Sequence, residues 1–273
     1  MMHERIYVNP EVPEVYIDTY VANLGDSRPA ILVVPGGGYK MVCTDREGEP
    51  IALDFVSRGY NAFVLNYRVG ENNHYPNQLL DGASAMVYIR NHAEEFKIDP
   101  KRVFAVGFSA GGHLVSALAT MHSDDAVKEY FGEDHLKVKP TGVISSYGVS
   151  VLRPNATALT FKRFVGKTEG FTDADVERFS IDRLVNESTA PMFLWHTAED
   201  QTVNPEDPYI MGLALKRAGV KHKISMYPYG PHGIALANET TARSYVPGDV
   251  QPLADRWTED AAEWFDTLPD SEF

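Results

Sequence analysis

Short apolar runs rich in β-branched residues alternate along this chain with segments of helical periodicity, and this alternation constrains the fold most strongly. Strands are predicted at residues 15–22, 30–35, 62–67, 103–107, 142–149, 192–196 and 223–227. Helices are predicted at residues 50–58, 79–96, 111–121, 209–218 and 256–268. Apolar runs bounded by turn residues are typical of parallel strands buried on both faces. Repeated strand–helix units therefore predict an α/β protein with a mostly parallel central sheet and helices on both faces.

The chain length suits a single α/β domain over residues 1–273. Residues 150–190 interrupt the alternation, because they contain four phenylalanines among scattered charges without a regular period: Phe161, Phe164, Phe171 and Phe179. We therefore expect a small cap inserted into the domain at 150–190.

Composition and charge exclude several classes of partner. The formal net charge is −13, whereas nucleic acids and anionic membranes bind basic surfaces, so neither is expected as a partner. No run approaches the roughly 18 apolar residues of a membrane span, and residues 1–5 lack the apolar run of a signal peptide. A single cysteine, Cys43, cannot form an internal disulfide. We expect a cytoplasmic protein; its oligomeric state stays open, a homo-oligomer included.

The segment Gly107-Phe108-Ser109-Ala110-Gly111 matches the G-x-S-x-G pattern of a sharp strand-to-helix turn. Glycine and serine are common in loops, so the pentapeptide alone is weak evidence. Its context strengthens it, because a buried strand precedes it and a helix follows, as the pattern requires. Ser109 is therefore the predicted nucleophile.

A second glycine-rich segment, Pro35-Gly36-Gly37-Gly38-Tyr39, follows an earlier predicted strand. Bare backbone amides in such a loop can stabilise the oxyanion of a tetrahedral intermediate. Gly37 and Gly38 are the predicted donors, together with Ala110, the residue after the nucleophile. A phosphate-binding loop would need Gly-Lys-Ser/Thr, which Tyr39-Lys40-Met41 does not supply.

A serine needs a histidine to accept its proton, and in this arrangement the base lies after the nucleophile in the chain. His232 follows the last predicted strand on a loop and is the predicted base. His113 and His122 belong to the helix that leads away from Ser109, and His196 is expected to pack within its strand. The two other histidines after Ser109 are expected at the surface, His135 and His222.

A carboxylate must orient the histidine. Asp200 leaves a predicted strand and is the first choice, with Glu199 as the alternative. Glu206 and Asp207 precede a predicted helix and are expected to cap it.

These motifs together resemble the α/β-hydrolase-fold serine esterases, in the carboxylesterase and acetylxylan-esterase-like branch. The resemblance covers residues 30–240 and is carried by VVPGGGY, REGEPIALDF, VLNYRV, YPNQLLDGASAMVYIR, VGFSAGGHL, PMFLWHTAEDQTVNP and YPYGPHGIAL. It implies hydrolysis of short-chain acyl esters, often acetyl groups on sugars such as xylo-oligosaccharides, through an acyl-enzyme and without metal or cofactor. It also implies Ser109, Asp200 and His232 as the catalytic residues. Arg68 and Asp81, which recur in such sequences, are interpreted as a structural ion pair.

Three other functions remain open. An arylformamidase has similar loops and size, and a small peptidase can share the catalytic domain. A non-catalytic binding protein of the same fold typically loses the serine or histidine, whereas here all three positions are filled. A small-molecule ester is the expected substrate.

Overall fold

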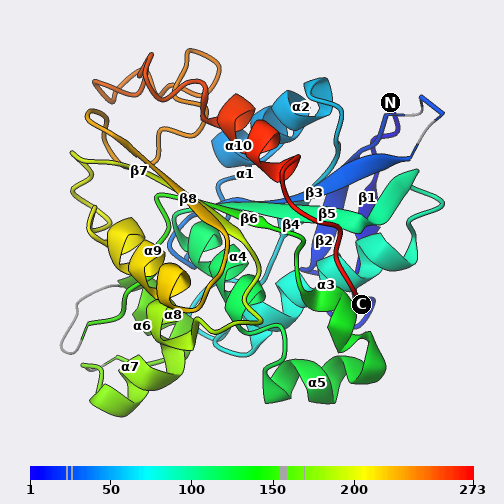
Figure 1. Ribbon diagram of the computed structural model, residues 1–273, viewed down its shortest axis with the longest axis horizontal. Helices are drawn as coiled ribbons and strands as arrows, with labels where there is room; N and C mark the ends of the chain where they lie inside the picture. Colours follow the sequence, from blue (N-terminus) through cyan, green and yellow to red (C-terminus); the bar gives the residue numbers. More distant parts are fainter. Residues whose placement is uncertain (23, 26, 154–158, 169) are drawn as a thin grey trace.

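A computed structural model describes residues 1–22, 24–25, 27–153, 159–168 and 170–273. Its centre is one sheet of eight strands in the order β1-β2-β4-β3-β5-β6-β7-β8 (Figure 1). The strands are β1 (Arg5–Tyr7), β2 (Tyr16–Tyr20), β3 (Arg28–Val34), β4 (Asn61–Asn66), β5 (Ile98–Phe108), β6 (Val143–Ser146), β7 (Met192–Thr197) and β8 (His222–Tyr227). β3 to β8 pair in parallel, and β1 and β2 add an antiparallel edge. The predicted mostly parallel sheet is confirmed.

Helices cover both faces of this sheet. They are α1 (Thr44–Glu47), α2 (Glu49–Ser57), α3 (Asn77–Asn91), α4 (Ala110–Thr120), α5 (Asp125–Phe131), the 3₁₀ helix η1 (Gly132–Val138), α6 (Leu159–Val165), α7 (Asp173–Phe179), α8 (Ile181–Leu184), α9 (Asp207–Arg217) and α10 (Trp257–Phe265). α3, α4 and α9 pack on one face, and α2 and α10 pack on the other (Figure 1). Among the described residues, every helix falls short of the length and apolar character needed to cross a bilayer.

Strand β3 shows why the central strands read as continuous apolar runs. Its side chains alternate between the two hydrophobic cores: Ala30, Leu32 and Val34 face α3 and α4, whereas Ile31 and Val33 face α2 and α10. Because helices cover both faces, both sets of side chains are buried, and the strand needs no polar positions.

The helix predicted over 79–96 is shorter than its apolar pattern, since α3 ends at Asn91. Phe96 extends the pattern because it packs into the core from the following turn, with its ring centroid 4.9 Å from that of Phe63. The strand predicted over 142–149 ends at Ser146, and Tyr147 adopts a positive φ of 39° directly after it.

The described part of the segment predicted as a cap contains three short helices, α6, α7 and α8, between β6 and β7. Phe161 and Phe164 are fully buried in α6, and both rings contact His113 of α4. Residues 154–158 and 169 of the predicted cap lie outside the described residues. The division into one domain with a cap at 150–190 stays a prediction.

Candidate active site

Ser109 lies at the sharp turn between β5 and α4, as predicted. Its backbone has φ 52° and ψ −114°, a conformation that costs a non-glycine residue on the order of 1–3 kcal/mol. A Cβ at Gly111 would lie 2.0 Å from the carbonyl oxygen of Val34, so only glycine lets α4 start this close to the end of β3. The glycine therefore brings the loop after β3 against the turn that carries Ser109.

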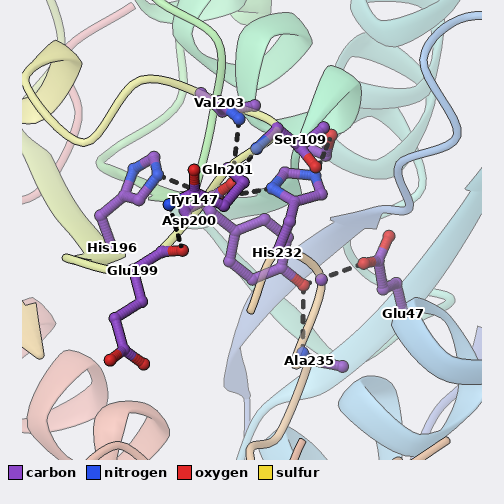
Figure 2. Close-up of polar contacts among 12 residues, drawn as sticks. Glu47, Ser109, Tyr147, His196, Glu199, Asp200, Gln201, Val203, His232 and Ala235 are labelled. Atoms are coloured by element: carbon purple, nitrogen blue, oxygen red, sulfur yellow. Dashed lines mark hydrogen bonds and ion pairs between the residues drawn. The ribbon is translucent and has the colours of Figure 1, made fainter. Parts of the chain in front are cut away.

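Ser109, His232 and Asp200 form one continuous chain of hydrogen bonds (Figure 2). His232 lies on the loop after β8, and Asp200 lies on the turn after β7. The Oγ of Ser109 is 2.9 Å from Nε2 of His232, and Nδ1 of His232 is 2.7 Å from Oδ2 of Asp200. Parallel strands deliver all three residues to the same edge of the sheet, the carboxyl ends of β5, β7 and β8.

The protonation states along this chain follow from the acceptor at its end. A carboxylate only accepts, so Nδ1 of His232 donates to Asp200, and in the neutral imidazole this leaves Nε2 as the acceptor for the Ser109 hydroxyl. This tautomer is the one that can take a proton from a serine.

The Asp200 side chain is fully buried, and its carboxylate accepts four hydrogen bonds. Its Oδ1 accepts from the amides of Thr202 and Val203 at 2.8 and 2.9 Å, and its Oδ2 accepts from His232 and from His196. Burial pushes the pKa of the Asp200 carboxyl upward, but the hydrogen bonds from His196 and His232 outweigh burial and hold that pKa well below its usual range. Asp200 is therefore ionised at neutral pH.

Glu199, the alternative acid, lies apart from this chain. Its side chain points away from the ring of His232 (Figure 2), and its Oε2 accepts from the amide of Gly230 at 3.2 Å.

His196 is the residue that sequence reasoning undervalued. It is buried in β7 as expected, but its Nε2 also donates to Asp200 at 3.0 Å. Two histidines thus share one carboxylate oxygen. The four-residue spacing between His196 and Asp200 is the only signal in the sequence, and it has meaning only once the turn after β7 is known.

The glycine-rich loop leaves its middle amides unused. Gly37 has a φ of +127°, and a Cβ there would lie 2.1 Å from the carbonyl oxygen of Met41, so the loop requires glycine. Within the described part of the chain, the amides of Gly37, Gly38 and Ala110 donate to no other protein group. Free amides of this kind can receive a negative oxygen.

Two of the other histidines after Ser109 are buried rather than part of this chain. Nδ1 of His113 is hydrogen-bonded to the Tyr39 hydroxyl, with 2.8 Å between the atoms, and burial lowers the pKa of His113 to about 3. Burial also lowers the pKa of His122 to about 4.

The ion pair between Arg68 and Asp81 is confirmed, with 2.6 Å between Nη2 and Oδ1. Glu206 and Asp207 lie at the start of α9, as predicted, but they do not act as its side-chain cap. Glu206 occupies the cap position of α9 without a capping hydrogen bond from its side chain. The buried carboxylate of Asp207 instead accepts from the amides of Ser150 and Val151 and pairs with Arg153 at 3.0 Å. It anchors the chain that leaves β6.

No group of three or more His, Cys, Asp or Glu side chains in the described ranges could hold a metal ion. The site contains a hydroxyl, an imidazole that can accept its proton, a buried carboxylate and free amides. This set is suited to acyl transfer.

Comparison with known proteins places the chain in a family. Residues 17–215 match the family described as BD-FAE. Endo-1,4-beta-xylanase B of Butyrivibrio fibrisolvens is 34% identical over 241 residues, which are 87% of this chain and 37% of that protein. An acetylxylan esterase of Xylanibacter ruminicola is 26% identical over 247 residues, 89% of this chain and 46% of that protein.

This chain thus spans less than half the length of these two curated relatives. The match to a solved structure extends over both chains. The acetyl ester-xyloside bifunctional hydrolase of Caldicellulosiruptor lactoaceticus has 31% identity and a TM-score of 0.80, over 97% of this chain and 96% of the other. The family match and the shared architecture show that the chain belongs to the BD-FAE family and has the α/β-hydrolase fold.

Proposed function

We propose that this protein is a serine carboxylesterase that hydrolyses short-chain acyl esters, with Ser109, His232 and Asp200 as its catalytic triad. The observation that carries the proposal is the chain of contacts from Ser109 Oγ to His232 Nε2 at 2.9 Å and from His232 Nδ1 to Asp200 Oδ2 at 2.7 Å. The names of the relatives favour acetyl groups on xylose-based sugars as the substrate class.

The reaction proceeds in two halves. In the first half, the Ser109 oxygen attacks the ester carbonyl while His232 takes its proton, and the amides of Gly37, Gly38 and Ala110 bind the oxyanion. The imidazolium then protonates the leaving alcohol, which leaves an acyl-enzyme. In the second half, His232 activates a water molecule that releases the acid and regenerates Ser109.

The test is a hydrolysis panel with acetylated xylo-oligosaccharides, p-nitrophenyl acetate and N-formylkynurenine, combined with a fluorophosphonate probe. We expect turnover of the acetyl esters and labelling of Ser109. Preferred cleavage of N-formylkynurenine would indicate an arylformamidase instead. A purified protein that neither labels nor hydrolyses any ester would indicate a binding protein of the same fold.

The pH dependence of stability should report the state of Asp200. Its pKa is lower in the folded than in the unfolded protein, so the stability that its ionisation adds is lost only as the pH falls below about 4. The measurement is Tm as a function of pH, and a Tm that does not fall below about pH 4 would contradict the ionised state of Asp200.

The acyl pocket should be small. The described helices between β6 and β7 span seven, seven and four residues. Phe161 and Phe164 of these helices pack against His113 of α4. We therefore expect kcat/KM to be highest between acetate and butyrate and to fall for longer p-nitrophenyl esters. In an open pocket each further methylene would add roughly 0.8 kcal/mol of binding, and activity would climb. A maximum at octanoate or beyond would overturn this expectation.

A further inference from the structure

A buried carboxylate outside the proposed triad connects two loops of the site. Glu47 ends α1 and is 3% exposed. Its Oε2 accepts from the amide of Gly36 at 2.8 Å, and its Oε1 accepts from the hydroxyl of Tyr147 at 2.9 Å. No ion pair reaches Glu47 from any described residue. A buried carboxylate without an ion-pair partner is a poor way to gain stability, because burial penalises its charged form.

Tyr147 continues the connection from Glu47 to the loop of His232. Its hydroxyl donates to Glu47 and accepts from the amide of Ala235 at 3.1 Å (Figure 2). Its ring lies edge-on to the imidazole of His232, with 5.0 Å between the ring centroids. Tyr147 also has a positive φ of 39°, and strain of this kind in a bulky residue is typical of functional sites.

The two ends of this chain of hydrogen bonds lie next to the reacting groups. Gly36 directly precedes the predicted oxyanion donors, and a Cβ on Gly36 would come within 3.0 Å of the Cβ of Ser109. Ala235 lies three residues after His232. The oxyanion donors and the base thus belong to separate loops, whereas acyl transfer needs both placed to within about 0.5 Å around one carbonyl.

We propose that Glu47 and Tyr147 are positioning residues that hold the glycine-rich loop and the His232 loop at a fixed separation across Ser109. This proposal rests on the proposed esterase function. Glu47 also occupies the amide of Gly36, which leaves the amides of Gly37 and Gly38 for the oxyanion. Burial, reinforced by the charge of Glu47, raises the pKa of Tyr147 well above its usual value, so the hydroxyl keeps its proton throughout the working pH range.

Other contacts limit how far the site would move without this pair. Arg46 donates to the carbonyl of Gly233 at 2.6 Å, and Arg243 donates to the carbonyl of His232 at 2.9 Å. Because both arginines still hold the loop, loss of the tyrosine hydroxyl should displace His232 slightly rather than release it.

The experiment is a double-mutant cycle of Tyr147→Phe and Glu47→Gln in the full chain, assayed with p-nitrophenyl acetate. Tyr147→Phe removes one oxygen and keeps the ring against His232. Glu47→Gln leaves one acceptor oxygen for two donors, the Gly36 amide and the Tyr147 hydroxyl. We expect each change to lower kcat by on the order of 10- to 100-fold with KM within about twofold. The kcat of the double variant should be no lower than that of the less active single variant, because both changes break the same chain of hydrogen bonds.

Tyr75→Phe is the matched control, since it also removes a hydroxyl that donates to a carboxylate, that of Asp124 at 2.6 Å. It should lower Tm at most and leave kcat at the wild-type value.

The pair is merely structural if Tyr147→Phe and Glu47→Gln lower Tm but leave kcat unchanged, or if their effects on kcat multiply in the double variant. Should Glu47→Gln fail to fold, Tyr147→Phe decides the question through its kcat. Failure of the proposed function would give a different result: the wild-type protein would hydrolyse no ester, or Ser109→Ala would retain turnover. In that case the inference about Glu47 and Tyr147 would be wrong as well.

Discussion

Ser109→Ala is expected to lower kcat for ester hydrolysis by about 10⁴–10⁶-fold and to leave the fold intact. The oxygen that is removed is the proposed nucleophile, and it is hydrogen-bonded to Nε2 of His232 at 2.9 Å. The Ser109 side chain forms no capping hydrogen bond to α4, and alanine inherits the same strained backbone. The measurement is kcat with p-nitrophenyl acetate, with Tm as the check on folding.

Ser116→Ala is a matched control on the same helix. The Ser116 hydroxyl is buried and donates to the carbonyl of Gly112 at 2.8 Å, so its loss should affect stability and not turnover. The assignment of Ser109 is contradicted if Ser109→Ala turns over like the wild type. It is also contradicted if Ser116→Ala loses activity to the same degree.

The sheet and the serine turn were predictable because local residue patterns encode them. Strand β3 is apolar at every position from Ala30 to Val34, and only burial on both faces explains such a run. The turn at Ser109 is predictable from the sequence because only glycine fits at position 111, where the backbone lies against the carbonyl of Val34. Both signals lie within a few residues of the structure that they specify.

The cap helices were not predictable from periodicity. Phe161 and Phe164 are three residues apart, as one face of a helix requires, but α6 is only seven residues long and shows no repeat. Both rings pack on His113, which belongs to another element, so the partner that fixes their position is distant in the sequence.

The supporting residues of the site were missed for the same reason. Tyr147 and Glu47 are 100 residues apart, and no local sequence pattern at either position predicts the hydrogen bond between them. The apolar strand predicts that His196 packs in the core, and His196 is buried as predicted. Its bond to Asp200 depends on how the chain turns after β7, which alternation in the strand does not reveal.

Asp200 and Glu199 both lie on the turn after β7, and Asp200→Asn, which changes the proposed acid, is expected to lower kcat by roughly 10⁴-fold. Four N–H donors converge on the Asp200 carboxylate, from His196, His232, Thr202 and Val203. The side-chain amide of asparagine has an NH₂ group in place of one oxygen, and this group would point at N–H donors that need an acceptor. The least costly response is for His232 to change tautomer, so that Nδ1 accepts from Asn and Nε2 carries a proton toward Ser109. That tautomer cannot act as the base.

His232→Ala should be more severe than Asp200→Asn, because it removes the group that transfers the proton rather than the group that orients it. Glu199→Gln is the matched control for the acid. Its exposed side chain contacts the amide of Gly230, an acceptor role that a glutamine oxygen can keep, so kcat should stay near the wild-type value. The comparison requires only kcat of the three variants at the pH optimum. If Glu199→Gln loses more activity than Asp200→Asn, then the acid of this site is Glu199, and the chain of hydrogen bonds through Asp200 is structural.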